Sequence, residues 1–351
     1  MHIREAMPED NEELQELQAK CPQGTTLIVS VVNTPDFFAR AKAYASYKVY
    51  VACEENRIIG SHACAIRDGI VSGKASRVGY SFQTFISSSH RRKSLAKQLL
   101  QYMEDHLIQT GAVLVYGLIM EGNLPSMKLV ESLGFRLHRT LVMRGLAVHK
   151  EMDVPFRGKV RPVVPEDLAA VATLLNETWQ GHDLYEPTSA VALARFIHRT
   201  PAYSFDNLLV LEDRGEILAC MGFWDWSQIM KITVIERSLK MRMIGFLLDI
   251  VRNFRPMPWD PKRGDVLKQL MLTPIAFKDP THLSVLLRYI NNQALSNGIE
   301  QIFCVCERGS PLLHSMKGFI RIDTGMHLYV KPLQQNVSMG DKPVFIDGID
   351  L

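Results

Sequence analysis

Apolar and polar positions along this chain alternate between strand-like runs and helix-like spacing. Residues 77–86 (RVGYSFQTFI) form an apolar and aromatic run of strand length, and apolar side chains then recur at helical intervals from Leu95 to Leu107. Residues 47–68 and 206–226 each contain two β-rich runs separated by polar turn residues. The pattern predicts an α/β (α+β) architecture in which mixed sheets are flanked by helices.

Two segments of the chain resemble each other and indicate an internal repeat. The first, HIREAMPEDNEELQELQ, begins at His2, and the second, KVRPVVPEDLAAVATLL, begins at Lys159. In both, Pro-Glu-Asp precedes a helical pattern, and we expect Asp10 and Asp167 to complement a helix N-terminus as N-cap or first-turn carboxylates. The chain therefore reads as two copies of one unit.

The repeat also predicts where the units begin and end. We expect a first domain over residues 1–150, a second over 158–331 and a short tail over 332–351. Each copy closes its last helix with a Gly-Phe pair, at 134–135 and 318–319, where glycine suits the left-handed position after a helix end.

Composition narrows the classes of protein to which this chain can belong. The 351 residues are 47% hydrophobic and 22% charged, as in globular proteins of two domains. The net charge of +3 is too small for a nucleic-acid coat, so any anion site must be local. The chain lacks both a long apolar run and a secretory signal, so we expect a cytoplasmic protein without membrane association.

The six cysteines favour reduced, buried thiols over a metal site. They contain no CxxC pair, and Cys304 and Cys306 lie in an apolar run that reads as a strand, on one face of the pleat. Too few other ligands lie nearby for a metal, and we predict none.

The stretch ISSSHRRKSLAKQLL, residues 86–100, carries the clearest chemical signal. A strand-like run ends at Ile86 and a helical pattern begins near Leu95, with three consecutive cations, Arg91 to Lys93, between them. The backbone N–H groups at a helix start, together with small residues such as Ser94 and Ala96, suit phosphate oxygens. A solvated cation cluster is the alternative interpretation.

This stretch resembles motif A of the GNAT superfamily of N-acetyltransferases, with Arg91-Arg92-Lys93-Ser94-Leu95-Ala96 in place of Arg/Gln-x-x-Gly-x-Gly/Ala. The segment NLPSMKLVESLGF, residues 123–135, is similar to motif B. The resemblance implies two tandem GNAT-like domains, each with a mixed, mostly antiparallel sheet flanked by helices. It also implies acetyl-CoA as the co-substrate and an amine as the acceptor.

The resemblance assigns cofactor-binding residues in the first copy. Backbone groups on the strand would pair with the pantetheine arm, those at the helix start would hold the pyrophosphate, and motif B would lie along the cofactor's arm. The residues assigned in this way are Thr84, Phe85, Ile86, Arg91, Arg92, Lys93, Ser94, Leu95, Ala96, Lys97, Asn123 and Ser126.

Two positions depart from the family pattern. Ser94 stands where the family usually has its first glycine; we expect a helical backbone there, since a left-handed one would cost about 1 kcal/mol. Val130 stands where the family often has a tyrosine that protonates the leaving thiolate. This second departure puts the usual mechanism in doubt.

The catalytic residues are less clearly marked. The strand over 77–86 has no Asp or Glu to act as a base, and the candidates on this strand and its neighbours are Tyr80 and His62. Packing in the core is the alternative for both, and a base acting through water is also open.

The second copy keeps the fold signals and loses the cofactor signals. Its matching turn is Lys278-Asp279-Pro280-Thr281-His282, in which proline removes a donor and the aspartate would repel phosphate. Glu307 replaces the motif B asparagine, and His314 stands at the tyrosine position. We therefore predict a degenerate second domain that covers the acceptor cleft or mediates dimerisation. Divergent binding of CoA by this copy is the alternative.

Three functions are weighed against these observations. The leading one is an N-acetyltransferase that transfers an acetyl group from acetyl-CoA to a small-molecule or peptide amine. The second is a catalytically impaired acyl-CoA sensor or regulatory protein, which Val130 favours. A nucleic-acid binder is disfavoured by the low net charge and the absence of interleaved aromatics. The acceptor and a homodimer are left open.

Overall fold

The first half of the chain alternates strands and helices. The computed structural model describes residues 1–351. Strands of this half are β1 (His2–Glu5), β2 (Leu27–Asn33), β3 (Ser46–Glu54), β4 (Arg57–Val71), β5 (Lys74–Ile86), β6 (Leu114–Met120) and β7 (Arg136–Ala147). Its helices are α1 (Asn11–Ala19), α2 (Ala39–Lys42), α3 (Leu95–Gln109) and α4 (Leu124–Ser132).

The second half repeats much of this order. Its strands are β8 (Lys159–Pro162), β9 (Leu208–Asp213), β10 (Glu216–Asp225), β11 (Met230–Arg237), β12 (Val266–Leu267), β13 (Gln269–Phe277), β14 (Gln301–Cys306) and β15 (Arg321–Pro332). Its helices are α5 (Leu168–Thr178), α6 (Ala190–Arg199), α7 (Leu239–Arg252) and α8 (Pro280–Ser296). Only a 3₁₀ turn, Pro311–His314, follows β14, where the first half has α4.

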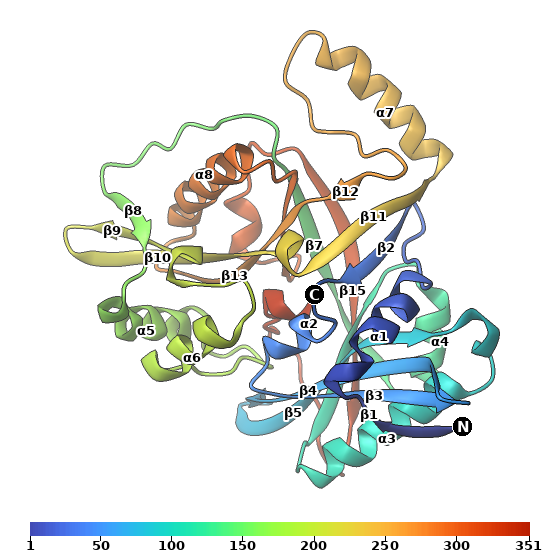
Figure 1. Cartoon of the computed structure of the whole chain (residues 1–351). Helices are drawn as coiled ribbons and strands as arrows, with labels where there is room; N and C mark the ends of the chain where they lie inside the picture. Colours follow the sequence, from blue (N-terminus) through green and yellow to red (C-terminus); the bar gives the residue numbers. More distant parts are fainter.

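One twelve-stranded sheet joins the two halves (Figure 1). Its order is β1-β3-β4-β5-β6-β15-β7-β14-β13-β10-β9-β8. The β5–β6 and β13–β14 pairs are parallel, and every other neighbouring pair is antiparallel. The predicted fold class, with mixed and mostly antiparallel sheets flanked by helices, is confirmed.

The last strands of the two halves are exchanged. β15, from the end of the second half, pairs with β6 of the first, and β7, from the end of the first half, pairs with β14 of the second. β15 and β7 also pair with each other along most of their length. The two structural units therefore do not coincide with the predicted sequence ranges 1–150 and 158–331, because each unit is completed by a strand of the other.

Helices cover both faces of the sheet, and the core divides accordingly. α3 lies over one buried cluster and α8 over another, and the predicted helical positions Leu95, Leu99, Leu100, Met103 and Leu107 are all buried. A larger cluster joins α1, α2, α5 and α6 on the other face with the C-terminal tail. No helix is both long enough and apolar enough to cross a bilayer.

The internal repeat is visible as two matching ion pairs. Arg4 donates to both carboxylate oxygens of Asp10 at 2.7 and 2.8 Å, and Arg161 does the same to Asp167 at 2.5 and 3.0 Å. Each aspartate also accepts the backbone N–H three residues before it. Both occupy the predicted N-cap position, but their carboxylates fix the preceding turn and do not bond to the helix.

These pairs predict a pH-dependent stability. The arginine hydrogen bonds lower the pKa of Asp10 and Asp167 below the usual value, which is about 3.9 in an unfolded chain. The stabilisation is therefore present above about pH 4 and is lost as pH falls through the folded-state pKa. We expect Asp10→Asn and Asp167→Asn each to lower the free energy of unfolding by about 1–2 kcal/mol at neutral pH.

Chemical denaturation of each variant between neutral and acidic pH measures this effect. The difference from the wild type should shrink as the pH falls below about 4. Asp68→Asn is the control, because Asp68 is exposed and 3.9 Å from an exposed Arg77. A deficit in the two variants that is independent of pH would show that the carboxylate charge is not the source of the stabilisation.

Candidate functional site

The turn between β5 and α3 leaves a row of backbone donors free. No backbone N–H from Arg91 through Lys97 has a hydrogen-bond acceptor in the protein, and the first helical bond runs from the N–H of Gln98 to the carbonyl of Ser94. Arg92 and Ser94 have positive φ values of 63° and 61°. A backbone of alternating handedness turns successive N–H groups to one side, as in anion-binding nests.

The expectation of a helical backbone at Ser94 is wrong. Ser94 is the N-cap of α3 with φ 61° and ψ 6°, in the left-handed region that glycine adopts at no steric cost. The turn therefore keeps the backbone of the family's glycine while carrying a serine. Motif spacing identified Ser94 as the residue at the glycine position. The handedness of its backbone depends on how the preceding turn enters α3, which the spacing does not show.

Ser94→Gly should stabilise the protein, since it removes the steric cost of a left-handed serine. We expect a gain of about 1 kcal/mol in the free energy of unfolding, partly offset by glycine's greater freedom in the unfolded chain. Thermal and chemical denaturation measure it. Ser72→Gly, at another positive φ of 51°, serves as a comparison in an exposed hairpin turn. A loss of stability in Ser94→Gly would contradict the assignment of strain to this residue.

The cations of the turn have different surroundings. The Nε of Arg91 donates to the carbonyl of Ile86 at 3.2 Å, so this side chain folds back over the end of β5. Arg92 and Lys93 are exposed, and neither forms an ion pair within the chain. The positive end of the α3 dipole adds to their charge at the same point. The turn can therefore attract an anion with both backbone donors and unpaired cations.

β5 and β6 pair along only part of their length. Their parallel pairing runs from Val78 opposite Leu114 to Ser81 opposite Gly117, and then ends. Gln83, with φ 51°, lies at the register shift in the β4–β5 pairing just beyond this point. The predicted residues Thr84, Phe85 and Ile86 follow on the stretch of β5 that β6 no longer pairs. On the edge of β5 that faces β6, the backbone groups of these three residues have no strand partner.

His62 lies beside the end of this pairing. Its Nδ1 is 2.9 Å from the Thr84 hydroxyl, and its Nε2 is 3.4 Å from the Ser81 hydroxyl. The residue is completely buried, and burial lowers the pKa of His62 to about 3. The imidazole is therefore neutral at physiological pH, and so low a pKa makes it a weak base while it stays buried.

Asn123 and Ser126 lie at the start of α4, directly after β6. The Asn123 side chain caps the helix by accepting the Ser126 N–H at 3.4 Å, which fixes its orientation. Val130 is half-buried on the same helix, among side chains of the cluster beneath α3. Val130 has no hydroxyl to take the place of the family's tyrosine.

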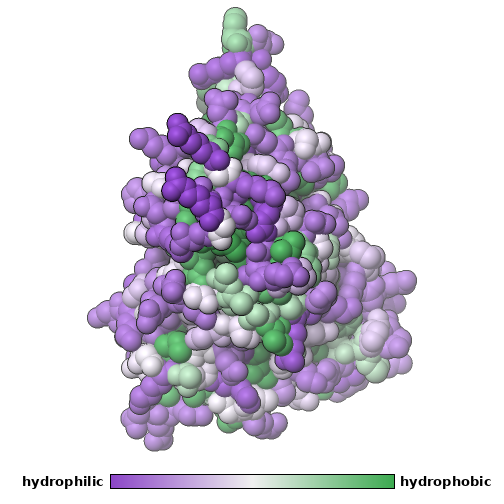
Figure 2. All heavy atoms as spheres, turned by 90° about the vertical axis from the view of Figure 1, so that its left-hand side faces the viewer, coloured by the Kyte–Doolittle hydropathy of each residue, from purple (hydrophilic) through white to green (hydrophobic).

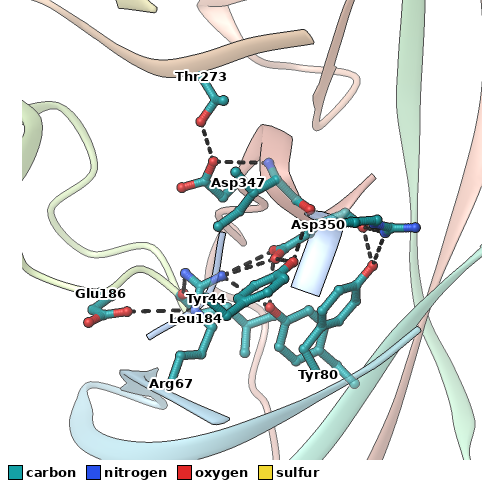
Figure 3. Close-up of polar contacts among 11 residues, drawn as sticks. Tyr44, Arg67, Tyr80, Leu184, Glu186, Thr273, Asp347 and Asp350 are labelled. Atoms are coloured by element: carbon teal, nitrogen blue, oxygen red, sulfur yellow. Dashed lines mark hydrogen bonds and ion pairs between the residues drawn. The ribbon is translucent and has the colours of Figure 1, made fainter. Parts of the chain in front are cut away.

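Tyr80 lies on the opposite face of β5 in a buried polar cluster (Figure 3). Its hydroxyl donates to the backbone carbonyl of Asp350 and accepts a hydrogen bond from Arg40 at 3.1 Å. Burial raises the pKa of Tyr80 above its usual value. The structure thus separates the two predicted catalytic residues, His62 and Tyr80, on the two faces of the sheet.

The rest of this cluster was not identified from the sequence. The Asp350 carboxylate accepts hydrogen bonds from the Tyr44 hydroxyl at 2.8 Å, from the Tyr116 hydroxyl at 3.0 Å and from Arg67 at 3.1 Å. Arg67 also donates to the carbonyl of Leu184 in the second half at 3.2 Å. No motif marks these residues, because the chain brings them together only when the tail folds back between the halves.

The C-terminal tail, residues 332–351, is held between the halves by contacts with both of them. Asp347 accepts a hydrogen bond from Thr273 on β13, and the Val344 N–H donates to Glu307 at 3.0 Å. Glu307, which replaces the motif B asparagine of the second copy, is also 3.1 Å from Arg139 on β7. The residue thus has a structural role between the halves.

The matching turn of the second copy has its donors occupied. Asp279 caps α8 by accepting the N–H of Thr281 at 2.8 Å, and Lys278 pairs with Glu216. Pro280 has no N–H, and the His282 N–H donates to the carbonyl of Asp279. A carboxylate therefore sits where the first copy has free donors. Trp224 on β10 is buried, and its Nε1 donates to the carbonyl of Pro201, so this tryptophan packs in the core.

Sequence comparison finds a family model that matches part of the first copy. Residues 11–135 match the model of the Acetyltransferase (GNAT) family, a range that includes the β5–α3 turn and the start of α4. No curated protein matches the chain's sequence at a significant level.

Solved structures resemble the whole chain. An N-myristoyltransferase from Saccharomyces cerevisiae with bound myristoyl-CoA aligns with a TM-score of 0.65 at 13% identity, covering 98% of this chain and 89% of that one. A GCN5-related glucosamine N-acetyltransferase region of a fungal multi-domain GH3 β-N-acetylglucosaminidase aligns with a TM-score of 0.60 at 10% identity, covering 93% of this chain and 38% of that one. At these identities the likeness shows a shared fold.

Proposed function

We propose that the protein is an acyl-CoA-dependent N-acyltransferase whose first copy binds the donor, because residues 11–135 match the Acetyltransferase (GNAT) family and the chain shares the fold of an N-myristoyltransferase. The observation that carries this proposal is the free row of N–H groups from Arg91 to Lys97 beside two unpaired cations. The equivalent turn of the second copy, with Asp279 and Pro280, supports donor binding in the first copy alone.

The donor would lie along the turn and the unpaired part of β5. Its pyrophosphate would accept hydrogen bonds from the N–H groups at the start of α3, near Arg92 and Lys93. Its pantetheine amides would pair with backbone groups of β5 between Thr84 and Ile86 that face away from β4, where β6 no longer pairs with the strand. The Ile86 carbonyl, which accepts from Arg91 Nε, would release that bond or share it with the donor. Asn123 and Ser126 at the start of α4 would flank the same arm.

The chemistry would be transfer of an acyl group from a thioester to an amine. The amine nitrogen bonds to the thioester carbon, the carbon–sulfur bond breaks, CoA leaves as its thiolate, and the amine gives up a proton. Holding the two reactants together removes several kcal/mol from the barrier. A backbone N–H near Gln83, where β5 has its irregularity and leaves β6, would polarise the carbonyl oxygen.

His62 is a better candidate for the proton acceptor than Tyr80. The Tyr80 hydroxyl donates to the carbonyl of Asp350, so it is already engaged on the other face of β5. His62 is neutral and reaches the hydroxyls of Ser81 and Thr84, which lie where β5 and β6 separate. Through these hydroxyls the imidazole would relay the amine proton rather than hold it, because its pKa is far below physiological pH.

The donor we propose is acetyl-CoA. The match of residues 11–135 to the Acetyltransferase (GNAT) family supports a short acyl group.

The activity test incubates the protein with acetyl-, hexanoyl- or myristoyl-CoA and a panel of amines and follows free thiol release. We expect release with acetyl-CoA and at least one amine. Donor binding without release for every amine would favour the sensor or regulatory alternative. Faster release with myristoyl-CoA would overturn the assignment of the donor.

His62→Gln tests the proton acceptor in the same assay. We expect kcat to fall on the order of 100-fold with little change in donor affinity, while His198→Gln, on an exposed part of α6, leaves kcat unchanged. Since the pKa of His62 is about 3, the wild-type rate should show no histidine inflection between about pH 5 and 8. An unchanged kcat in His62→Gln would remove it from the mechanism.

A further inference from the structure

The helix α7 leaves the body of the protein with most of its apolar side chains in solvent. In Figure 1 it projects above β11 and β12, and in Figure 2 the molecule narrows to this end. Large apolar residues exposed on the helix or directly after it are Leu239 (73%), Met243 (62%), Ile244 (41%), Phe246 (67%), Leu247 (60%), Ile250 (45%) and Phe254 (85%). Five of them repeat at helical intervals, so they form one continuous stripe.

We call α7 and the loop after it, residues 238–263, the arm. Contacts on the opposite side of α7 hold the arm so that this stripe faces outward. The opposite side of α7 carries Gly245, which packs so closely on Asp260 of the following loop that a Cβ would lie 2.2 Å from its carboxylate. Arg237, at the end of β11, pairs with Asp260 at 2.5 Å and donates to the carbonyl of Met241. These contacts fix the loop behind the helix and leave the apolar stripe without a partner in the chain.

Positive charge gathers on the same arm. Residues 238–263 contain six cations and two carboxylates, a net charge of +4, whereas the whole chain carries +3. The rest of the chain is therefore slightly negative. Lys240 and Arg242 lie on either flank of the stripe at 3.6 residues per turn, and neither forms an ion pair. The side chains of Lys240 and Arg242 are both exposed to solvent.

We propose that α7 and its following loop form a docking surface for an anionic lipid bilayer. An apolar stripe flanked by cations, with an aromatic residue at its end, is the pattern of a helix that lies in the membrane interface. Anionic headgroups would neutralise Lys240 and Arg242 while the acyl region covers Phe246 and its neighbours. A second copy of this chain is less suited, because it would bring a second +4 arm against the first.

This inference differs from the expectation of no membrane association. That expectation rested on the absence of a long apolar run, which excludes a spanning helix and says nothing about one that lies on the surface. α7 has only 14 residues, too few to cross a bilayer but enough for an interfacial helix. The proposal is independent of whether the first copy binds acyl-CoA.

Co-sedimentation of the full chain with vesicles tests the proposal. The vesicles are phosphatidylcholine alone or phosphatidylcholine mixed with phosphatidylserine. We expect binding to the mixed vesicles that weakens in high salt, and Phe246→Glu should lower the partition coefficient by about tenfold or more. Val191→Glu, at a 60%-exposed apolar site on α6, is the matched control and should bind as the wild type.

The remaining outcomes would overturn the proposal. If the wild type does not bind phosphatidylserine vesicles, or if Val191→Glu loses as much binding as Phe246→Glu, the stripe is not a lipid surface. Analytical ultracentrifugation without lipid tests the alternative occupant. A dimer that Phe246→Glu dissociates would assign the stripe to a second copy of the chain. Circular dichroism and thermal melting establish that each variant is folded.

Discussion

Replacing Arg92 and Lys93 together by glutamate should weaken acetyl-CoA binding on the order of 100-fold, because it reverses both unpaired cations at the proposed pyrophosphate site. Neither side chain forms an ion pair or packs in the core, so the fold should be unaffected. Isothermal titration calorimetry measures the dissociation constant. The weakening should be greater at low ionic strength, since salt screens exposed charges.

The second copy supplies a control at the equivalent place. Lys278→Glu reverses the one cation at the start of α8, where Asp279 and Pro280 leave no free row of donors. We expect its acetyl-CoA affinity to equal that of the wild type. An unchanged affinity in the Arg92/Lys93 variant, or a large loss in Lys278→Glu, would contradict the assignment of the donor to the first copy.

Arg67→Ala should lower the free energy of unfolding by about 3–5 kcal/mol, because it leaves the Asp350 carboxylate buried without its cation. The carboxylate side chain is fully buried and that of Arg67 is 8% exposed, so water cannot replace the lost partner. The tyrosine hydroxyls of Tyr44 and Tyr116 would remain as its only side-chain donors. Chemical denaturation measures the loss.

Two further variants show whether the loss of stability comes from breaking the buried Arg67–Asp350 pair or from removing any arginine. Arg77→Ala removes an exposed arginine 3.9 Å from Asp68 and should cost about 1 kcal/mol or less. Adding Asp350→Leu to Arg67→Ala removes the unpaired charge and should recover part of the stability. If Arg67→Ala costs no more than Arg77→Ala, the cluster does not hold the tail between the halves.

Local sequence patterns predicted the elements well because their signals are local. The buried positions of α3 follow from apolar spacing, and the repeated Pro-Glu-Asp indicated two copies that share the Arg4–Asp10 and Arg161–Asp167 pairs. The exchange of β7 and β15 could not be predicted in this way. Both strands satisfy the same pattern, and only their long-range pairing decides which half each one completes.

The proposed donor site could be predicted in part, because its backbone donors come from one continuous segment of the chain. The turn from Arg91 to Lys97 has the free N–H groups that its position before a helix implies. The handedness of Ser94 was predicted wrongly because serine rarely adopts a positive φ. Asp350 and Arg67 lie 283 positions apart in the chain, so no motif could join them before the tail's path was known.

The most direct test of the central claim is a crystal structure of the full chain with bound CoA. We predict that the pyrophosphate lies within hydrogen-bond distance of backbone N–H groups between Arg92 and Lys97, with the pantetheine arm along β5 from Thr84 to Ile86. The turn from Lys278 to His282 should be empty. A pyrophosphate at that second turn, or a CoA bound away from α3, would contradict the account.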